Sequence, residues 1–286
     1  MSTDEGPLFT SLISRALSED LGLRGDITTQ ALFDADHPGR AVIKSKQSGV
    51  VSGIQLMEPL FHHIDPSLTV GVFARNGDDI TPGTRICRLE GRVRSILAGE
   101  RVALNFLQHL SGIATATRGL AALISHTRAK LLDTRKTTPL LRLVEKEAVV
   151  HGGGCNHRFG LFDMILIKDT HVKAAGGVLP AAVKAQEYVR RSGFDVKIEI
   201  EIQSLDQFKD ALSAGIDRIM LDNMDIQDMA ACVALAQKSG SSVETEASGN
   251  VSAQTIVAIA ETGVDYISVG AITHSAPALD IHLVIE

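Results

Sequence analysis

Basic side chains gather around one apolar stretch of an otherwise acidic chain. In the segment GGGCNHRFGLFDMILIKDTHVK, residues 152–173, they stand on both sides of the apolar run 164–167. They are His157, Arg158, Lys168, His171 and Lys173. The whole chain carries 28 Lys and Arg against 34 Asp and Glu, which argues against a broad surface for polyanions. A local cluster of this kind therefore indicates a pocket that binds an anionic group.

Charged residues also alternate with isoleucine in the segment VKIEIEI, residues 196–202. Successive side chains of a strand point to opposite faces, so Lys197, Glu199 and Glu201 face the interior of a barrel if the isoleucines face the surrounding helices. Charged groups in that position need cationic partners, a metal or a ligand. The pattern leaves one alternative open, a half-exposed edge strand with a solvated charged face.

Other apolar segments of strand length are also followed by polar residues. In chain order these are Arg135, Lys136, Asp222, Ser248, Gly249, Gly270 and His274. Arg and Lys suit carboxylates and phosphates, whereas glycines and small hydroxyls suit a phosphate bound by backbone N–H groups. The carboxylates of Glu201 and Asp222 suit a hydrated divalent cation or sugar hydroxyls. Together these residues indicate a ligand with phosphate, hydroxyl and carboxylate groups.

Strands and helices that alternate from residue 129 onward must position these groups. The strands are predicted at 129–134, 164–169, 196–202, 218–223, 242–248 and 265–271. Helices are predicted between them, at 139–150, 178–193, 204–215, 226–238 and 253–262. This alternation predicts a parallel α/β sheet or barrel, with reactive residues at the carboxyl ends of the strands. No GxGxxG fingerprint opens any unit, so we favour a barrel with fewer than eight strands over a dinucleotide fold.

The part of the chain before residue 95 has a different pattern. It combines an amphipathic helix with alternating strands that Gly, Asn and Pro turns interrupt, which predicts a smaller α+β domain. Residues 95–126 form one long, largely apolar helical segment. We therefore predict a first domain at 1–113 and a barrel domain at 114–275. The last segment, 276–286, is predicted to contain one more strand, and its return to the first domain is left open.

Composition narrows the functional classes. Trp is absent and Tyr occurs twice, so a stacking platform for nucleic acid is not expected. No stretch reaches the roughly 20 apolar residues that a membrane span needs. The three cysteines are not at CxxC spacing, and the N-terminal residues show no basic and apolar signal pattern. These features predict a cytoplasmic protein without a nucleic-acid or membrane partner.

The motifs, taken together, resemble those of the quinolinate phosphoribosyltransferase family, also called carboxylating nicotinate-nucleotide pyrophosphorylase. In the barrel segment they are DTRKTTP (133–139), NHRFGL (156–161), MILIKDTH (164–171), IEIE (198–201), MLDN (220–223), EASGN (246–250) and SVGAITHSAPALD (268–280). Upstream they are GDITT (25–29) and ERVALNFLQHLSGIAT (100–115). They follow the order of the family and cover most of the chain from residue 25.

The resemblance implies an N-terminal α/β sandwich domain followed by an incomplete α/β barrel of six or seven strands. It also implies the transfer of a phosphoribosyl group from phosphoribosyl pyrophosphate to quinolinate. Decarboxylation accompanies the transfer, and nicotinate mononucleotide, pyrophosphate and CO2 are formed in NAD biosynthesis. The family requires Mg2+. It forms homodimers, or hexamers built as trimers of dimers, in which subunits share a site.

The resemblance also assigns roles to residues at matching positions. Quinolinate is expected to bind Arg101 from the neighbouring subunit and, within one chain, Arg135, Lys136, His157, Arg158 and Lys168. Phosphoribosyl pyrophosphate is expected to bind Lys136, Lys168, Glu201, Asp222, Ser248, Gly249, Gly270 and His274. The expected catalytic residues are Lys136, Glu201 and Asp222, and the last two are also expected to bind Mg2+, directly or through water. Thr170 stands where the family more often has Asn, which affects only local contacts.

Four alternatives remain at this stage. Two belong to the same superfamily: a homologue associated with molybdenum transport, and a nicotinate phosphoribosyltransferase, whose substrate has a single carboxylate. A third is an aldolase that forms a Schiff base on Lys136 or Lys168. The fourth is a paralogue that binds the substrates without turnover. The intact DTRKTTP motif argues against the molybdenum-associated homologue, the number of cations against the nicotinate enzyme, and the pair of carboxylates against the paralogue. The aldolase is to be distinguished by borohydride trapping with a carbonyl substrate.

Overall fold

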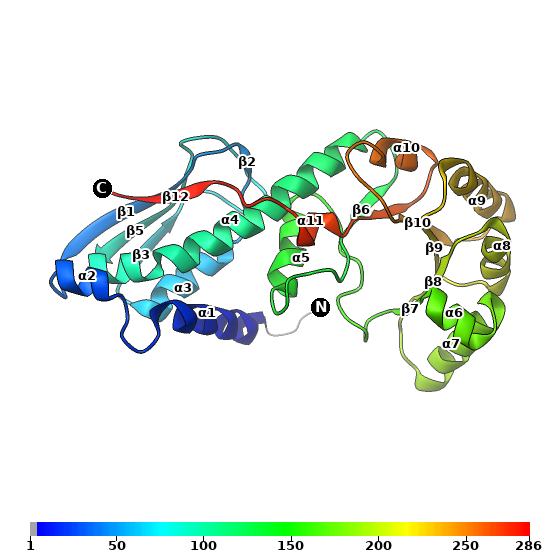
Figure 1. The fold of residues 1–286 in the computed structure, drawn as a ribbon, viewed down its shortest axis with the longest axis horizontal. Coiled ribbons are helices and arrows are strands. Elements are labelled where there is room, and N and C mark those ends of the chain that lie inside the picture. Colours follow the sequence, from blue (N-terminus) through cyan, green and yellow to red (C-terminus); the bar gives the residue numbers. More distant parts are fainter. Residues whose placement is uncertain (1–4) are drawn as a thin grey trace. The chain divides into compact units, whose positions relative to one another are not determined.

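The computed structural model describes residues 5–286, which contacts divide into two compact units. The first unit contains the described residues up to 118, together with 138–153 and 276–286. The second contains 119–137 and 154–275. Figure 1 traces the chain through both units.

The first unit is built on a four-stranded antiparallel sheet with the order β12-β1-β5-β3. The strands are β1 (Pro38–Ser45), β3 (Thr69–Val72), β5 (Arg85–Arg92) and β12 (Ile281–Ile285). A small ladder pairs β2 (Gly49–Val50) with β4 (Asp79–Ile80). The helical elements are α1 (Glu5–Leu21), α2 (Ile27–Leu32), η1 (Ile54–Leu56), α3 (Met57–Ile64), α4 (Val93–Leu123) and α5 (Arg142–His151).

Close packing around β1 and α4 forms the core of this unit. Consecutive β1 residues 41–43 are all fully buried, so both faces of this strand are covered. On α4, a Cβ added at Gly99 would lie 2.7 Å from the ring of Phe61, so this glycine lets α3 approach α4 closely. The last strand, β12, pairs along β1 in antiparallel register (Figure 1). The end of the chain therefore belongs to the first sheet.

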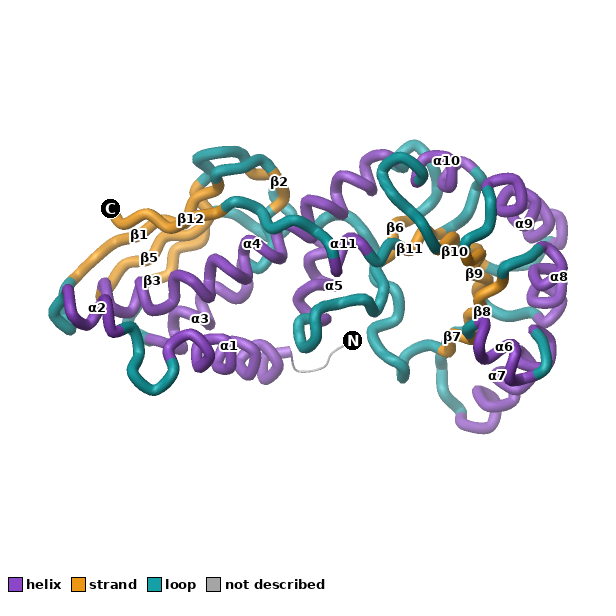
Figure 2. Tube along the Cα trace, in the orientation of Figure 1, coloured by secondary structure: helices purple, strands orange, loops and turns teal. Residues whose placement is uncertain are grey.

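The second unit is built on six parallel strands with the order β6-β11-β10-β9-β8-β7. They are β6 (Lys130–Leu132), β7 (Ile165–Ile167), β8 (Ile198–Ile202), β9 (Arg218–Asp222), β10 (Glu244–Ser248) and β11 (Tyr266–Ser268). The helices are α6 (Asp169–Ala175), α7 (Val178–Ser192), α8 (Leu205–Ala214), α9 (Ile226–Ser239), α10 (Ile256–Glu261) and α11 (Ala271–His274). Figure 2 shows the curved sheet with α7 to α10 on its outer side. The predicted fold class, with an incomplete six-stranded barrel, is confirmed.

Strand β8 has the alternation that the sequence indicated. Ile200 is fully buried among the helices, whereas Glu199 is fully buried on the opposite, interior face. The strand pairs with β7 on one side and with β9 on the other. The alternative of a half-exposed edge strand is therefore wrong, because hydrogen-bonded neighbours cover both edges of β8.

The units differ in two places from the predicted segments. The predicted boundary between residues 113 and 114 falls inside α4, a continuous helix of 31 residues. Helix α5, which the strand–helix alternation suggested as part of the barrel, belongs by its contacts to the first unit. A local pattern gives the type of an element, but the unit that it joins depends on distant contacts. None of the helices between residues 5 and 286 combines the length and apolar character that a membrane-spanning helix needs.

Candidate active site

A cavity of about 460 Å³ lies at the carboxyl ends of the strands of the second unit. Its lining combines basic, acidic and hydroxyl side chains from successive strand ends. The lining residues are Thr134, Arg135, Lys136, His157, Arg158, Leu166, Lys168, Glu201, Met220, Asp222, Ser248 and Ser268. The structure therefore brings together most of the residues that the sequence selected within one chain. The position of the cavity follows from the parallel sheet, in which all carboxyl ends meet at one edge.

Two arginines, Arg135 and Arg158, line this cavity. Arg158 donates from Nη1 to the backbone carbonyl oxygen of Met164 at 3.2 Å. Burial lowers the pKa of Arg158, and the positive charge of Arg135 lowers it further. Arginine stays protonated nonetheless, so two like charges act on each other in the cavity. Such an arrangement favours an anion between or beside them, because a bound carboxylate or phosphate relieves the repulsion.

The backbone around Lys136 is fixed on both sides. Its N–H donates to Oγ1 of Thr134 at 3.0 Å, and its carbonyl accepts from Oγ1 of Thr273 at 2.8 Å. A Cβ added at Gly270 would lie 2.8 Å from Cδ of Lys136 and 3.3 Å from the ring of His274. Gly270 therefore leaves room for the Lys136 side chain to pass. This contact joins the predicted phosphate residues to the basic side of the cavity.

Lys168 connects the basic and acidic sides of the cavity. Its Nζ lies 3.0 Å from Oε1 of Glu201, although the lysine side chain remains about half exposed. The backbone N–H of Lys168 donates to Nδ1 of His171 at 2.9 Å and caps helix α6. Lys173, at 4.0 Å from Asp169, is highly exposed. Of the five basic residues around the apolar run, His171 and Lys173 are thus not among the lining residues.

The acidic side consists of Glu201 at the end of β8 and Asp222 at the end of the neighbouring β9. The Asp222 carboxylate accepts from Nε2 of Gln203 at 3.2 Å and from Nδ2 of Asn223 at 3.0 Å. Both acidic residues are only partly buried and line the cavity. Their oxygens can therefore meet hydroxyls or a hydrated cation of a bound ligand.

The predicted phosphate residues lie at the ends of β10 and β11. Ser248 lines the cavity and Gly249 follows it with a φ of 96°. Gly270 precedes the short helix α11, and His274 ends that helix with Nδ1 at 2.6 Å from Oγ of Ser275. Gly249, Gly270 and His274 are not among the lining residues. They nevertheless adjoin it, through Ser248 and through the contact of Gly270 with Lys136.

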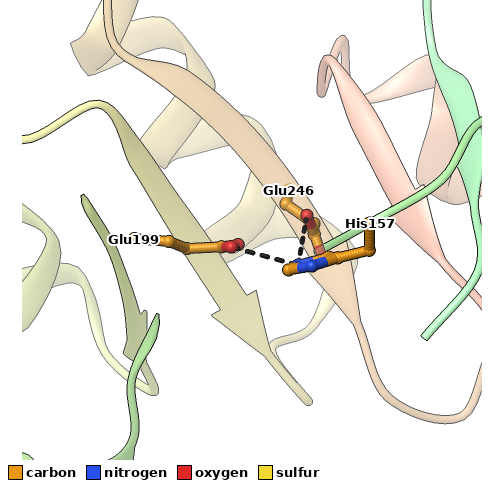
Figure 3. A group of neighbouring side chains, drawn as sticks. All are labelled: His157, Glu199 and Glu246. Atoms are coloured by element: carbon orange, nitrogen blue, oxygen red, sulfur yellow. Dashed lines mark ion pairs between the residues drawn. The ribbon is translucent and has the colours of Figure 1, made fainter. Parts of the chain in front are cut away.

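Figure 3 shows a buried group of three side chains, of which His157 also lines the cavity. The Nε2 atom of His157 is 3.0 Å from Oε2 of Glu199 and 3.6 Å from Oε2 of Glu246. Both glutamate side chains are fully buried. Arg218 supplies a positive charge at 3.1 Å from Glu246, and its guanidinium also contacts Glu244 at 2.9 Å. The glutamates and Arg218 come from β8, β9 and β10 and share the interior face of the sheet, whereas His157 lies in the loop before β7.

Burial changes the acidity of this group. It raises the pKa of Glu199 to about 7, against the opposing effect of the Arg218 charge. It raises the pKa of Glu246 to about 8, and the neighbouring Glu199 contributes in the same direction. Nδ1 of His157 accepts the backbone N–H of Arg158 at 2.7 Å, so a neutral ring carries its proton on Nε2, toward the carboxylates. His157 therefore directs its donor away from the open cavity and fixes the backbone that carries Arg158.

His157, Glu199 and Glu246 also form the one group of three ligand-type side chains that could hold a metal among residues 5–286. The contacts do not favour a metal there. With Nδ1 accepting a hydrogen bond, Nε2 has no lone pair to offer, and Arg218 already compensates one carboxylate. Sequence reasoning gave no role to Arg218 or Glu246. The alternation within residues 218–222 and 244–248 was the available signal that they face inward.

Arg101 lies on α4 in the first unit and is exposed. Next to it in sequence, Val102 and the following Asn105 line a separate pocket of about 340 Å³ in that unit. This pocket also receives residues from α1 and from the turn before α5. Arg101 is therefore on an accessible surface of the first unit and is not among the residues that line the cavity of the second.

Comparison with known proteins gives matches over nearly the whole chain. Residues 26–111 match the model of the quinolinate phosphoribosyl transferase N-terminal domain, and residues 113–284 match that of the C-terminal domain. The chain is 41% identical to the chloroplastic nicotinate-nucleotide pyrophosphorylase [carboxylating] of Arabidopsis thaliana, with 96% of this chain and 82% of that protein covered. It is 40% identical to a probable nicotinate-nucleotide pyrophosphorylase [carboxylating] of Bacillus subtilis, with 95% and 91% covered. The solved structure of the nicotinate-nucleotide pyrophosphorylase from Francisella tularensis superposes with a TM-score of 0.91 at 40% identity, with 98% and 96% covered.

Proposed function

The chain belongs to the quinolinate phosphoribosyltransferase family, and we propose that it converts quinolinate and phosphoribosyl pyrophosphate into nicotinate mononucleotide, pyrophosphate and CO2 in NAD biosynthesis. The observation that carries this proposal is the cavity at the strand ends, where the basic and acidic residues of the family motifs meet. The family assignment argues against an aldolase, a nicotinate enzyme and a molybdenum-associated homologue, and turnover of the two substrates would distinguish an enzyme from a paralogue that only binds them.

Quinolinate is a dianion, and the guanidiniums of Arg135 and Arg158, which line the same cavity, suit its two carboxylates. Each arginine can donate two parallel hydrogen bonds to a carboxylate, which fixes the plane of the pyridine ring as well as its position. Lys136 supplies a third positive charge from the same strand end. A ring held in this way presents its nitrogen lone pair to C1 of the ribose in a fixed orientation, which lowers the entropic cost of the reaction.

The chemical step requires no covalent bond to the protein. The ring nitrogen forms a bond to C1 of the ribose while the bond from C1 to the pyrophosphate oxygen breaks. The bond from ring carbon 2 to its carboxylate then breaks, CO2 leaves, and the electron pair left on the ring takes up a proton. Positive charge develops on the ribose during the transfer, and the carboxylates of Glu201 and Asp222 are placed to stabilise it. Lys168, paired with Glu201, is placed to meet the negative pyrophosphate.

The 5′-phosphate is proposed to bind at the ends of β10 and β11. Ser248 offers a hydroxyl in the cavity lining, and Gly249 and Gly270, at the ends of the same two strands, have no side chain to shield their backbone N–H groups. His274, next to Gly270, adds a polar ring. Phosphate sites after the last two strands are a recurring feature of α/β barrels, which supports this placement.

Glu201 and Asp222 also suit the Mg2+ that the family requires. They offer hard oxygen donors at a partly exposed cavity, as a hydrated Mg2+ prefers. The buried group around His157 lacks this character, because it is enclosed and includes a protonated ring nitrogen. When bound, Mg2+ supplies compensation for the charge of the pyrophosphate group. Glu201 and Asp222 would hold it directly or through water.

We also propose that Arg101 completes the site of a second subunit in a homodimer, or in a hexamer built from such dimers. Its exposure on α4, beside the pocket of the first unit, supports a role toward a partner. A twofold dimer gives two identical composite sites. A cytoplasmic location is proposed as well, and the three free cysteines support a reducing compartment. The Arabidopsis relative is named as chloroplastic.

The proposed function is tested by incubating the purified protein with Mg2+, quinolinate and phosphoribosyl pyrophosphate and following nicotinate mononucleotide by mass spectrometry. Parallel reactions contain nicotinate in place of quinolinate. The expected result is product from quinolinate, in equal amount with CO2, and at least about a hundredfold less from nicotinate because one carboxylate contact is missing. The proposal would be refuted if no nicotinate mononucleotide formed at a saturating concentration of quinolinate.

A further inference from the structure

Asn223 connects two parts of the candidate site that come from different strands. It follows Asp222 at the end of β9, and its Nδ2 donates to Oδ1 of that carboxylate at 3.0 Å. Its Oδ1 accepts from Nδ2 of Asn250 at 3.1 Å, and its backbone N–H donates to the carbonyl of Ser248 at 2.9 Å. One side chain thus contacts the acidic side of the cavity and the loop that follows β10.

The backbone conformation at residues 223, 249 and 250 leaves room for these contacts. Asn223 and Asn250 have φ values of 54° and 51°, in the left-handed region that asparagine tolerates better than most residues. Gly249, between Ser248 and Asn250, has a φ of 96°. A Cβ added there would lie 2.1 Å from Oδ1 of Asn223, so the amide occupies the space of the missing side chain. The loop 248–250 and the end of β9 therefore interlock through Asn223.

We propose that Asn223 is a positioning residue for phosphoribosyl pyrophosphate, which holds Asp222 and the loop 248–250 at one fixed separation. The inference rests on the proposed function, in which Asp222 meets the ribose and the loop meets the 5′-phosphate. With both held together, binding of the remote phosphate places C1 of the ribose correctly for the transfer. An amide is suited to this task, because it donates to a carboxylate with one atom and accepts from a second amide with the other.

Two neighbouring residues share only one half of this connection and serve as matched comparisons. Gln203 donates to the other oxygen of Asp222 at 3.2 Å, and its backbone N–H donates to Gln207 on α8 rather than to the loop. Asn250 contacts Asn223 but not Asp222, and it has the same left-handed backbone. If Asn223 couples Asp222 to the loop 248–250, loss of its side chain must lower kcat/KM for phosphoribosyl pyrophosphate more than loss of the Gln203 or Asn250 side chain does.

The experiment compares the Asn223→Gly, Asn223→Asp, Gln203→Ala and Asn250→Gly variants with the wild-type protein. Glycine keeps the left-handed backbone and removes both side-chain contacts. Aspartate keeps the acceptor for Asn250 but sets a carboxylate oxygen against Asp222. Steady-state kinetics are measured for each substrate, quinolinate binding alone is measured by calorimetry, and the melting temperature reports on folding.

The expected result is a loss confined to one substrate. Asn223→Gly should lower kcat/KM for phosphoribosyl pyrophosphate at least about tenfold, the size expected for a lost hydrogen bond to a charged group. Asn223→Asp should lose at least as much, while Gln203→Ala and Asn250→Gly each lose less than Asn223→Gly. The Kd for quinolinate should stay within about twofold of the wild-type value. The melting temperature should change by no more than about 2 °C.

Two results overturn the inference. One is Asn223→Gly kinetics equal to those of the wild type. The other is an equal loss for both substrates with a lowered melting temperature, which marks a purely structural role. If the wild-type protein makes no nicotinate mononucleotide, the proposed function fails, and calorimetry with phosphoribosyl pyrophosphate and Mg2+ then decides the inference. Tighter binding by the wild type than by Asn223→Gly supports it, whereas equal binding, or none, overturns it.

Discussion

Replacement of Arg158 by alanine should weaken the use of quinolinate while the protein remains folded. In the wild type this guanidinium lies in the cavity beside Arg135 and donates one hydrogen bond, to the carbonyl of Met164 at 3.2 Å. Its other donors are available to a bound carboxylate. The substitution therefore removes a substrate contact and one weak internal hydrogen bond.

The magnitude follows from the opposing effects of this charge. Loss of a charge-assisted hydrogen bond costs about 1.5–3 kcal/mol, which corresponds to roughly 10- to 150-fold in kcat/KM. Relief of the repulsion with Arg135 offsets part of this loss, so a decrease of about 10- to 100-fold is expected for quinolinate. The unfolding free energy should change by no more than about 1 kcal/mol. The lost hydrogen bond to Met164 is at the long end of the normal range, and the relief of repulsion with Arg135 acts in the opposite direction.

The assay measures initial rates over a range of quinolinate concentrations at saturating phosphoribosyl pyrophosphate, with urea unfolding of the same samples. Arg128→Ala is the matched control, since that arginine is also in the second unit but pairs with Asp265 and is about half exposed. Arg158→Lys keeps the positive charge but lacks the two parallel N–H donors of a guanidinium, so its kcat/KM for quinolinate should lie between those of Arg158→Ala and the wild type. Wild-type quinolinate kinetics in Arg158→Ala, with the protein folded, would refute the assignment of this arginine to the substrate.

The variants Glu201→Gln and Asp222→Asn should each lower kcat more than they change the Kd for quinolinate, because the carboxylate charge that they lack matters most as the ribose becomes positive. An unchanged kcat in both variants would show that the carboxylates have only a structural role. Arg101→Ala and Arg158→Ala alone should each lower kcat/KM for quinolinate at least about tenfold. Equal mixing with subunit exchange should raise this value toward about a quarter of that of the wild type, because half the dimers then carry one intact site of two. Heterodimers seen by native mass spectrometry without regained activity would remove Arg101 from the partner's site. Glu246 has a pKa raised to about 8 in the folded protein against 4.5 as its ordinary value, so its contribution to stability is complete below about pH 4.5 and is lost as pH rises through about 8. Urea unfolding between these pH values should therefore show a steeper fall for wild type than for Glu246→Gln, and parallel curves would contradict the raised pKa.

Local sequence patterns predicted the six strands of the second unit and helices α7 to α10 in the right order, but not the short helices α6 and α11. The isoleucine alternation at 198–202 predicted β8 and the inward orientation of Glu199, both of which the structure confirms. The polar residues after each apolar run were expected at one edge of a parallel sheet. That expectation required only the α/β alternation, because parallel strands end on the same side. Most of the selected residues of the second unit accordingly line one cavity.

The connections between distant segments were not predictable in this way. The partners of His157 come from β8 and β10, and Arg218 reaches them from β9 between those strands. The sequence therefore presented His157 as one of several basic residues, without the carboxylates that determine where its proton points. The link through Asn223 likewise depends on the loop after β10 lying against the end of β9.

The sequence by itself determined the alternating elements, the chemical types at the strand ends and the family motifs, because each depends on residues close together in the chain. Only the tertiary structure decided which unit holds helix α5 and strand β12, and which charged groups become neighbours. Those features depend on strand order and register between segments tens of residues apart, which local periodicity does not encode. Burial then acts on the neighbours so formed, and it raises the pKa values of Glu199 and Glu246 because a low-dielectric interior disfavours their charged forms.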